Sequence, residues 1–222
     1  MNLKDYEYYR TDLGVLYNAD CLEIMPHLEP VDLVLTDPPY GIGQKIEREN
    51  KSKKSVIKRT KYIVPVEKWD NIPPPEYFEI LYNISKNQII FGGNFFVEYL
   101  KNSPCWIVWD KDRKNRMADC ELVYTSFDTA VRKIKYTWNG MIKEVPETRY
   151  HPTQKPVGLI IQILNKYGNQ EWSTLDTHCG SGSTLVACER LNRRWIGIEI
   201  EEKYCAIAKK RIEKERSQLK LF

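Results

Sequence analysis

The ten residues VDLVLTDPPY, numbered 31–40, are the most informative stretch of this chain. Residues 31–36 are mostly apolar and branched, which is typical of a strand buried on both faces of a parallel sheet. Directly after them, Asp37-Pro38-Pro39-Tyr40 places an acid, a rigid diproline and an aromatic ring where that strand would end. Because ligands of open α/β sheets bind at the carboxyl ends of strands, these four residues are the first candidates for a functional site.

Strand-like and helix-like segments alternate on both sides of this stretch. We expect strands at residues 14–20, 31–36, 88–91, 105–109, 173–176 and 194–199. We expect helices at residues 21–28, 76–85, 95–100, 157–167, 184–191 and 203–215. Two further β-like segments, 121–127 and 130–136, are expected to form a hairpin. The alternation predicts an α/β fold with a mostly parallel sheet.

The composition is that of a globular protein with one domain. Of the 222 residues, 42% are hydrophobic and 29% are charged, so a single domain spanning residues 1–222 can bury a full core. The chain contains no apolar run near the ~20 residues that a membrane helix needs. Residues 1–6 lack the apolar core of a signal peptide, so we expect a cytoplasmic protein.

The cysteines indicate neither a metal site nor a disulfide framework. None of them is paired as C-x-x-C, and no nearby histidines complete a zinc-binding spacing. We therefore expect reduced thiols in a reducing compartment and no bound metal. The six residues are Cys21, Cys105, Cys120, Cys179, Cys188 and Cys205.

Positive charge is concentrated directly after the 31–40 stretch. Residues 41–62 contain eight Lys or Arg residues against two Glu residues, whereas the whole chain has a net charge of only +4. The segment 41–65 lacks periodicity and is expected to be a basic, mobile loop. Such a block fits a polyanion such as nucleic acid, although a solvated loop without a partner explains it as well.

A second candidate site combines an acid with a glycine-rich turn at residues 176–184. The turn follows an expected strand and precedes an expected helix, where backbone N–H groups can meet a ligand. Its spacing is that of neither a dinucleotide fingerprint nor a P-loop, and Asp176 would repel a phosphate. The turn suits a cation such as an amino-acid ammonium, or else it is a tight connection without a ligand. Glu199 ends the next strand, where an acid suits a ribose diol if it is not simply exposed.

Together, three motifs resemble the amino-methylating DNA methyltransferases of the beta class. They are Asp37-Pro38-Pro39-Tyr40, His151-Pro152-Thr153-Gln154-Lys155-Pro156 and the run DTHCGSGST at 176–184. The resemblance implies a single Rossmann-like methyltransferase domain with a seven-stranded sheet, an antiparallel edge hairpin and a circularly permuted motif order. It also implies S-adenosylmethionine as the cofactor and DNA as the substrate.

The resemblance assigns catalytic roles to the first motif. Asp37 and the carbonyl of Pro38 would accept hydrogen bonds from the target amine, which directs the nitrogen lone pair toward the methyl group. Tyr40 would stack on a base flipped out of the duplex, and Pro39 would hold the turn. No covalent nucleophile is needed, so positioning should supply most of the rate.

Cofactor contacts follow from the same resemblance. Asp176 and the backbone of the glycine-rich turn would hold the methionine part, Glu199 the ribose, and Asp20 would lie near the adenine. The family usually has a phenylalanine where this chain has His178, which is either a space-filling ring or a pH-sensitive contact. Lys155 is expected to pair with the cofactor carboxylate. The expected lining of the cofactor pocket also includes Thr153, Cys179, Gly180, Ser181, Gly182 and Ser183.

The target base and the partners are less determined. Asp at the first motif position favours adenine N6 over cytosine N4, and an RNA or protein amine methyltransferase or a non-catalytic nucleic-acid-binding module stay as alternatives. Residues 110–150 are a candidate target-recognition region. A homodimer and a cognate restriction endonuclease are compatible partners that the sequence itself does not show. The candidate DNA contacts are Lys45, Lys53, Lys54, Lys58, Arg59, Arg113 and Arg116.

Overall fold

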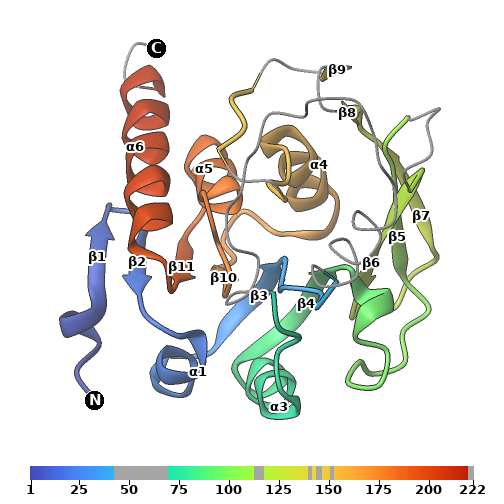
Figure 1. Ribbon diagram of the computed structural model, residues 1–222, viewed down its shortest axis with the longest axis horizontal. Coiled ribbons are helices and arrows are strands. Elements are labelled where there is room, and N and C mark those ends of the chain that lie inside the picture. The colour runs from blue at the N-terminus through green and yellow to red at the C-terminus, as the bar shows by residue number, and fades with distance from the viewer. Residues whose placement is uncertain (43–69, 113–117, 140–141, 144–146, 151–152, 220–222) are drawn as a thin grey trace, which may run out of the picture.

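The structure, a computed structural model, describes residues 1–42, 70–112, 118–139, 142–143, 147–150 and 153–219 (Figure 1). Most of the basic segment 41–65 therefore lies outside the described residues. The same holds for all seven candidate DNA contacts, which are Lys45, Lys53, Lys54, Lys58, Arg59, Arg113 and Arg116.

The described residues form one large mixed sheet, which occupies the middle of the molecule (Figure 1). Neighbouring strands from β2 to β4 run parallel, as do β5 and β7, whereas β1–β2, β4–β6 and β5–β6 are antiparallel. A separate pair, β8 (Trp138–Asn139) and β9 (Ile142–Lys143), is antiparallel. The order of the nine strands in the large sheet is β1 (Glu7–Arg10), β2 (Gly14–Asn18), β11 (Trp195–Glu199), β10 (Thr174–Asp176), β3 (Val31–Thr36), β4 (Ser85–Phe91), β6 (Cys120–Thr125), β5 (Trp106–Asp110) and β7 (Arg132–Lys135).

The expectation of seven strands is wrong, and so is the hairpin between residues 121–127 and 130–136. β1 was not predicted, because the start of the chain is polar. It pairs antiparallel with β2 and adds an edge strand. β6 cannot pair with β7 because its two edges are taken by β4 and β5. β7 instead pairs in parallel with the free edge of β5.

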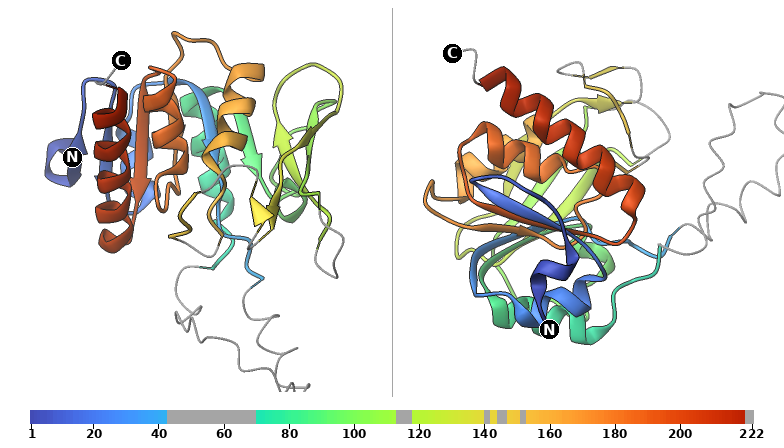
Figure 2. Two further views of the ribbon diagram at one scale, coloured as in Figure 1. Left: turned by 90° about the horizontal axis from the view of Figure 1, so that it is seen from above. Right: turned by 90° about the vertical axis from the view of Figure 1, so that its left-hand side faces the viewer.

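Helices cover both faces of the sheet, which gives three layers (Figures 1 and 2). On one face, α4 (Val157–Tyr167), α5 (Ser183–Arg190) and α6 (Glu202–Leu219) lie side by side. The other face carries α1 (Cys21–Ile24) and α3 (Pro75–Ile84). Short 3₁₀ turns are η1 (Leu3–Tyr6), η2 (Met25–His27) and η3 (Gly93–Phe95), and η3 replaces the helix expected at 95–100.

The core is divided by the sheet into two apolar layers. Along β3, Leu33 and Leu35 pack into the layer under α4–α6, whereas Val34 packs into the layer under α1 and α3. The stripe on α4 is equally well buried, with Leu159 and Ile163 both 0% exposed. Burying such a side chain stabilises the fold by ~1.5–3 kcal/mol, so these layers fix the strands whose ends carry the candidate residues.

The strand order creates a crevice at the carboxyl end of β3. β3 and β10 are neighbours, but the chain leaves β3 for α3 and β4 and leaves β10 for α5 and β11. Since α3 and α5 lie on opposite faces (Figure 1), the two connections separate at this point. Where the connections of two neighbouring parallel strands leave on opposite faces, a crevice for a ligand forms outside the carboxyl ends of the strands.

Three further features bear on the expected class of protein. None of the helices in the described part of the chain is long and apolar enough to cross a membrane. Within the same residues, no cluster of three or more His, Cys, Asp or Glu side chains is arranged to hold a metal ion. The six cysteines are all free thiols, and five of them are buried.

Candidate active site

A cavity of about 790 Å³ lies at the carboxyl ends of the parallel strands. It brings together nearly all of the catalytic and cofactor residues predicted from the sequence. Those that line it are Asp20, Asp37, Pro38, Pro39, Tyr40, Thr153, Lys155, Asp176, His178, Cys179, Gly180, Ser181, Ser183 and Glu199. Asp20 has a second role, because its Oδ1 accepts a hydrogen bond from the N–H of Leu22 (2.9 Å) and caps α1.

Asp37 is held from both sides directly after β3. Its Oδ1 accepts a hydrogen bond from the Tyr40 hydroxyl (2.5 Å), and its Oδ2 lies 2.6 Å from Lys155 Nζ. Burial raises the pKa of Asp37, whereas the charge of Lys155 opposes that rise. Burial alone would lower the pKa of Lys155, but the charge of Asp37 and of a second carboxylate, Glu121, outweighs it and raises that pKa. Lys155 is therefore an ammonium ion at neutral pH.

Lys155 was expected to pair with a cofactor carboxylate, and the structure gives it a different contact. Its Nζ reaches the motif acid Asp37 and lies 3.4 Å from the Tyr40 hydroxyl. The side chain of Lys155 is only 8% exposed, so its ammonium is committed to this corner of the cavity. A contact with the cofactor carboxylate stays a prediction.

Tyr40 is fixed by its neighbours rather than by the diproline alone. Its ring stacks on Phe95, with centroids 4.8 Å apart and planes 15° apart, and meets Phe96 edge-on at 5.9 Å. Gly92 has a φ of +67°, and a Cβ added there would lie 2.3 Å from the Tyr40 ring. A residue without a side chain is therefore required at position 92 for the ring to occupy its place.

Asp176 ends β10 as a buried acid, 4% exposed, and Oδ1 accepts a hydrogen bond from the His178 N–H (3.2 Å). Burial raises the pKa of Asp176 to about 7, against hydrogen bonds from Thr184, His178 and Thr36, and the charge of Asp37 raises it further. Among the described residues, none of the groups that set this pKa is a cation. The carboxyl thus lines the cavity without a counter-charge and fits a cationic ligand group.

Glu199 ends β11 with both carboxylate oxygens oriented by backbone groups. Oε2 accepts from the N–H of Gly180 (2.9 Å) and Oε1 from the N–H of Glu201 (2.8 Å). Burial raises the pKa of Glu199, and these hydrogen bonds oppose that rise. Each oxygen keeps a lone pair for a further donor, so the fixed carboxylate fits a pair of hydroxyl groups.

His178 is a neutral ring at physiological pH. Burial lowers its pKa to about 4. Its Nδ1 lies 3.0 Å from the hydroxyl of Thr177, its Nε2 lies 3.8 Å from the Sγ of Cys21, and its ring meets Tyr77 edge-on at 5.4 Å. These contacts favour the interpretation of a space-filling ring over that of a pH-sensitive contact.

Gly182 is the one predicted cofactor residue that is not among the residues lining the cavity. It is the N-cap residue of α5 with a φ of +79°, a conformation that favours glycine. A Cβ there would lie 2.8 Å from the Cβ of Ala208 on α6. Position 182 therefore serves the close packing of α5 against α6.

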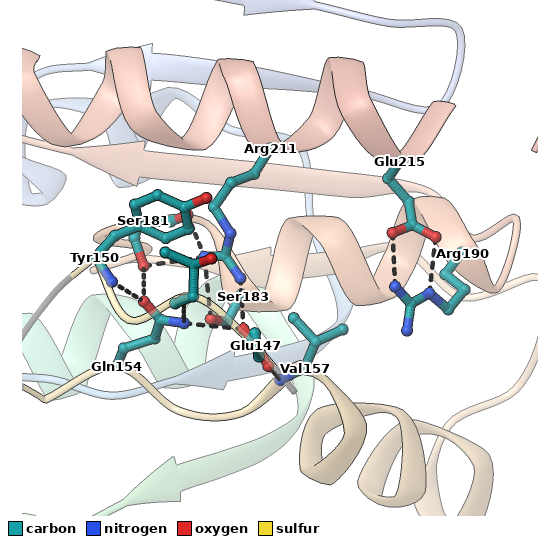
Figure 3. Close-up of polar contacts among 10 residues, drawn as sticks. Glu147, Tyr150, Gln154, Val157, Ser181, Ser183, Arg190, Arg211 and Glu215 are labelled. Carbon is teal, nitrogen blue, oxygen red and sulfur yellow. Dashed lines mark hydrogen bonds and ion pairs between the residues drawn. The ribbon is translucent and has the colours of Figure 1, made fainter. Parts of the chain in front are cut away.

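Arg211 on α6 supports the glycine-rich turn from behind, a role that the sequence analysis missed. Figure 3 shows its guanidinium between the turn and Glu147. Nη1 donates to the carbonyl oxygen of Ser181 (2.5 Å) and to the hydroxyls of Ser181 (3.0 Å) and Ser183 (3.3 Å), while Nη2 pairs with Glu147 (2.8 Å). The sequence contained a signal for this role. Arg211 follows Ala208 at helical spacing and so falls on the same buried face of the helix, where an apolar side chain is usual.

Gln154, inside the motif at residues 151–156, was also not singled out. Its Oε1 accepts hydrogen bonds from the Tyr150 N–H (2.8 Å) and the Ser181 hydroxyl (3.2 Å), and its Nε2 donates to Glu147 (2.9 Å) (Figure 3). Glu147 also accepts from the N–H of Val157 (3.1 Å) and so caps the start of α4. This network joins the turn at 180–183 to the segment that carries Lys155.

Comparison with known proteins places the chain in a family. Residues 50–210, more than half of the chain, match the DNA methylase family N6_N4_Mtase. The type II methyltransferase M2.DpnII of Streptococcus pneumoniae is 28% identical in an alignment 254 positions long, and this alignment covers 94% of this chain and 92% of that protein. The type II methyltransferase M2.LlaDCHI of Lactococcus lactis subsp. cremoris is 26% identical over 257 residues, with coverages of 93% and 92%.

Solved structures agree in fold. The M1.HpyAVI–SAM complex has a TM-score of 0.58 and 23% identity, and the match covers 89% of this chain and 99% of that one. The cytosine-N4-specific PvuII DNA methyltransferase has a TM-score of 0.64 and 15% identity, with coverages of 97% and 94%. The chain therefore belongs to the N6_N4_Mtase family of DNA methylases and has their α/β methyltransferase fold. It is an S-adenosylmethionine-dependent DNA methyltransferase.

The support from Arg211 can be tested by replacing it with methionine, which keeps much of the volume and removes the donors to residues 181 and 183. We expect the affinity for S-adenosylmethionine, measured by isothermal titration calorimetry, to fall about tenfold because the turn loses its fixed shape. Arg190→Met is the matched control, since Arg190 pairs with Glu215 on the same helix α6 but away from the turn (Figure 3). An equal loss in both variants, or none in Arg211→Met, would contradict this role.

Proposed function

We propose that this enzyme transfers the methyl group to the exocyclic N6 of adenine in DNA, with Asp37, Pro38 and Tyr40 as the catalytic residues. The observation that carries the proposal is the position of Asp37. It lies at the carboxyl end of β3, where the connections that follow β3 and β10 leave on opposite faces of the sheet. The acids Asp176 and Glu199 line the same cavity. An acid at the first position of the Asp37-Pro38-Pro39-Tyr40 motif supports adenine over cytosine.

The mechanism relies on positioning. The Asp37 carboxylate and the Pro38 carbonyl accept hydrogen bonds from the target amine and direct its lone pair toward the methyl carbon. When bound, S-adenosylmethionine would supply a methyl group activated by its sulfonium, with a neutral thioether as the leaving group. The methylated nitrogen would carry one extra proton, and the Asp37 carboxylate, hydrogen-bonded to that amine, can accept it. Tyr40, held by Phe95 and Phe96, stacks on the flipped base.

The remaining lining residues fit the parts of the cofactor. Asp176 provides a negative charge for the ammonium group, and the two oriented oxygens of Glu199 suit the ribose hydroxyls. Asp20 lies near the adenine, and Thr153 with the backbone at 178–181 and at 183 encloses the methionine part. The cavity volume of about 790 Å³ accommodates the cofactor together with a base.

The organisation of the chain follows from this assignment. Residues 1–222 form one methyltransferase domain with a circularly permuted order, because the proposed catalytic motif precedes the cofactor turn along the chain. The segment 41–65 and the region 110–150 contact DNA and provide the target recognition. Their basic residues, Lys45 to Arg59, Arg113 and Arg116, support this through attraction to phosphates.

Partners and location are part of the same proposal. The relatives M2.DpnII and M2.LlaDCHI are type II methyltransferases, which supports a role in restriction–modification beside a cognate endonuclease. A DNA substrate supports action in the cytoplasm. The proposal includes self-association as a homodimer, which light scattering on the intact protein would test.

The catalytic assignment is tested by methyl transfer from labelled S-adenosylmethionine to unmethylated DNA, followed by nucleoside analysis. We expect N6-methyladenine from the wild type and a rate at least ~10²-fold lower for Asp37→Asn, because the variant keeps the shape but loses the charged acceptor. Binding of S-adenosylhomocysteine, measured separately, should persist in the variant.

The other outcomes of this assay are equally informative. N4-methylcytosine as the product would keep the mechanism and correct the base. Cofactor binding without transfer to DNA would point to RNA or protein as the substrate or to a non-catalytic module. Full activity in Asp37→Asn would overturn the assigned role of the acid.

The role of Asp176 predicts a pH dependence of cofactor binding. Its pKa is raised to about 7, so a bound cation should lower that pKa and release a proton on binding near neutrality. The affinity should therefore rise as the pH increases from about 6 to about 7.5. Calorimetry in buffers of different ionisation enthalpy would detect the released proton. The Asp176→Asn variant should bind more weakly and without this pH dependence, and an unchanged slope in the variant would exclude Asp176 as its source.

A further inference from the structure

Outside the cavity, the ion pair between Lys155 and Asp37 is extended by two further charged side chains, Glu121 and Lys111. Lys155 Nζ lies 2.6 Å from Asp37 Oδ2 and 3.5 Å from Glu121 Oε2. Lys111 Nζ forms an ion pair with the other oxygen of Glu121. The result is a row of four alternating charges, in the order Lys111, Glu121, Lys155 and Asp37, of which only the last two line the cavity.

The antiparallel part of the sheet brings these groups together. β6 runs antiparallel to β4, with Phe91 opposite Val123, so the beginning of β6 lies at the edge where β3 ends. β5 pairs antiparallel with β6, with Asp110 opposite Cys120, and this places Lys111 at the same edge. Glu121 and Lys111 therefore approach Asp37 from the side that the parallel strands leave open.

Burying this row of charges costs desolvation free energy, which stability alone does not explain. The side chains of Lys111 and Lys155 are 10% and 8% exposed, and that of Glu121 is 23% exposed. Glu121 Oε2 is buried and makes no hydrogen bond within the described part of the chain. Removing charges from water costs several kcal/mol per ion, and well-packed apolar side chains often serve stability as well. Buried charges beside a reacting group indicate a functional purpose.

Glu121 and Asp37 share one ammonium group. The negative charge of Glu121 raises the pKa of Asp37, after burial and against the charge of Lys155. Burial would raise the pKa of Glu121 itself, but the charges of Lys155 and Lys111 outweigh this and lower it, so Glu121 is ionised at neutral pH. Without Glu121, Lys155 would neutralise Asp37 more fully, and Asp37 would be a weaker hydrogen-bond acceptor.

We infer that Glu121 and Lys111 are positioning residues, which act through Lys155 to set how strongly Asp37 accepts a hydrogen bond from the target amine. This inference rests on the proposed catalytic role of Asp37. Lys111 and Glu121 act in opposite directions: Glu121 draws Lys155 away from Asp37, and Lys111 limits that pull by satisfying Glu121.

The other groups that face Asp37 constrain the experiment. The Tyr40 hydroxyl donates to Asp37, and its pKa is raised well above the ordinary value by burial, so it does not titrate near neutrality. Asp176, on the neighbouring strand β10, has a pKa of about 7 and would contribute to a pH profile. Saturating cofactor removes that contribution, because Asp176 is then held in its charged form.

The test compares the pH dependence of single-turnover methyl transfer at saturating S-adenosylmethionine for Glu121→Gln and Lys111→Met. Loss of the negative charge of Glu121 should move the acid limb to lower pH by about one unit. Loss of the positive charge of Lys111 should move it to higher pH, because Glu121 then attracts Lys155 more strongly. A purely structural role would change stability in both variants without opposite shifts.

A second readout does not depend on activity. The carboxyl of Asp37, assigned in a ¹³C NMR titration by comparison with Asp37→Asn, should shift its midpoint in the same two directions. Lys86→Met and Glu215→Gln are matched controls, since each breaks an ion pair away from Asp37 and outside the region proposed to contact DNA, and both should keep the wild-type profile. Inactivity of the wild type, or full activity of Asp37→Asn, would refute the proposed function instead.

The inference is overturned if the two variants shift in the same direction, if only one shifts, or if neither does. If Glu121→Gln fails to fold, Lys111→Met decides alone, and an acid limb that does not move to higher pH overturns the inference. Affinity for the cofactor is expected to stay within about twofold in both variants, because neither residue lines the cavity.

Discussion

The ion pair between Asp37 and Lys155 joins parts of the chain that are 118 residues apart. Asp37 follows the central strand β3, and Lys155 precedes α4, which packs on one face of the same sheet. Because both side chains are largely removed from water, neither can be charged at low cost without the other. The segment before α4 is thus fixed at the mouth of the crevice, and the hydrogen bonds of the neighbouring Gln154 carry that constraint to the glycine-rich turn.

The glycine-rich turn at 180–183, proposed to hold the cofactor, and the proposed catalytic residues Asp37 and Tyr40 with Lys155 are consequently parts of one polar network. Arg211 and Glu147 hold the turn from the side of α6, and Gln154 connects them to the residue next to Lys155 (Figure 3). Glu147 also accepts a hydrogen bond from the start of α4. The same carboxylate therefore links that helix, the turn through Arg211 and, through Gln154, the segment that carries Lys155. Methyl transfer requires the two reactants to be aligned closely, and a shared network of this kind keeps both halves of the site in register.

The sequence predicted the cavity better than the sheet around it. Each of the acids Asp37, Asp176 and Glu199 was expected at the end of a strand, and parallel strands bring their carboxyl ends to one edge. The family resemblance then assigned the three acids to a single site. The pairing of β7 with β5 could not be predicted, because it depends on which strand edges are already occupied. The contact of Lys155 with Glu121 likewise depends on the alignment of β6 against β4, which no local pattern encodes.

The distribution of charge also explains what the cavity admits. Lys155 is the one cation among the described residues that line it, whereas Asp20, Asp37, Asp176 and Glu199 are acids. Such a surface attracts a cofactor that carries a sulfonium and an ammonium, and it repels the phosphates of DNA. A neutral base can still enter once it is flipped out, with its amine donating to an acid. In the proposed mechanism, the excess of acids keeps the DNA backbone at the rim and admits the base alone, and the inferred sharing of Lys155 keeps Asp37 from being neutralised.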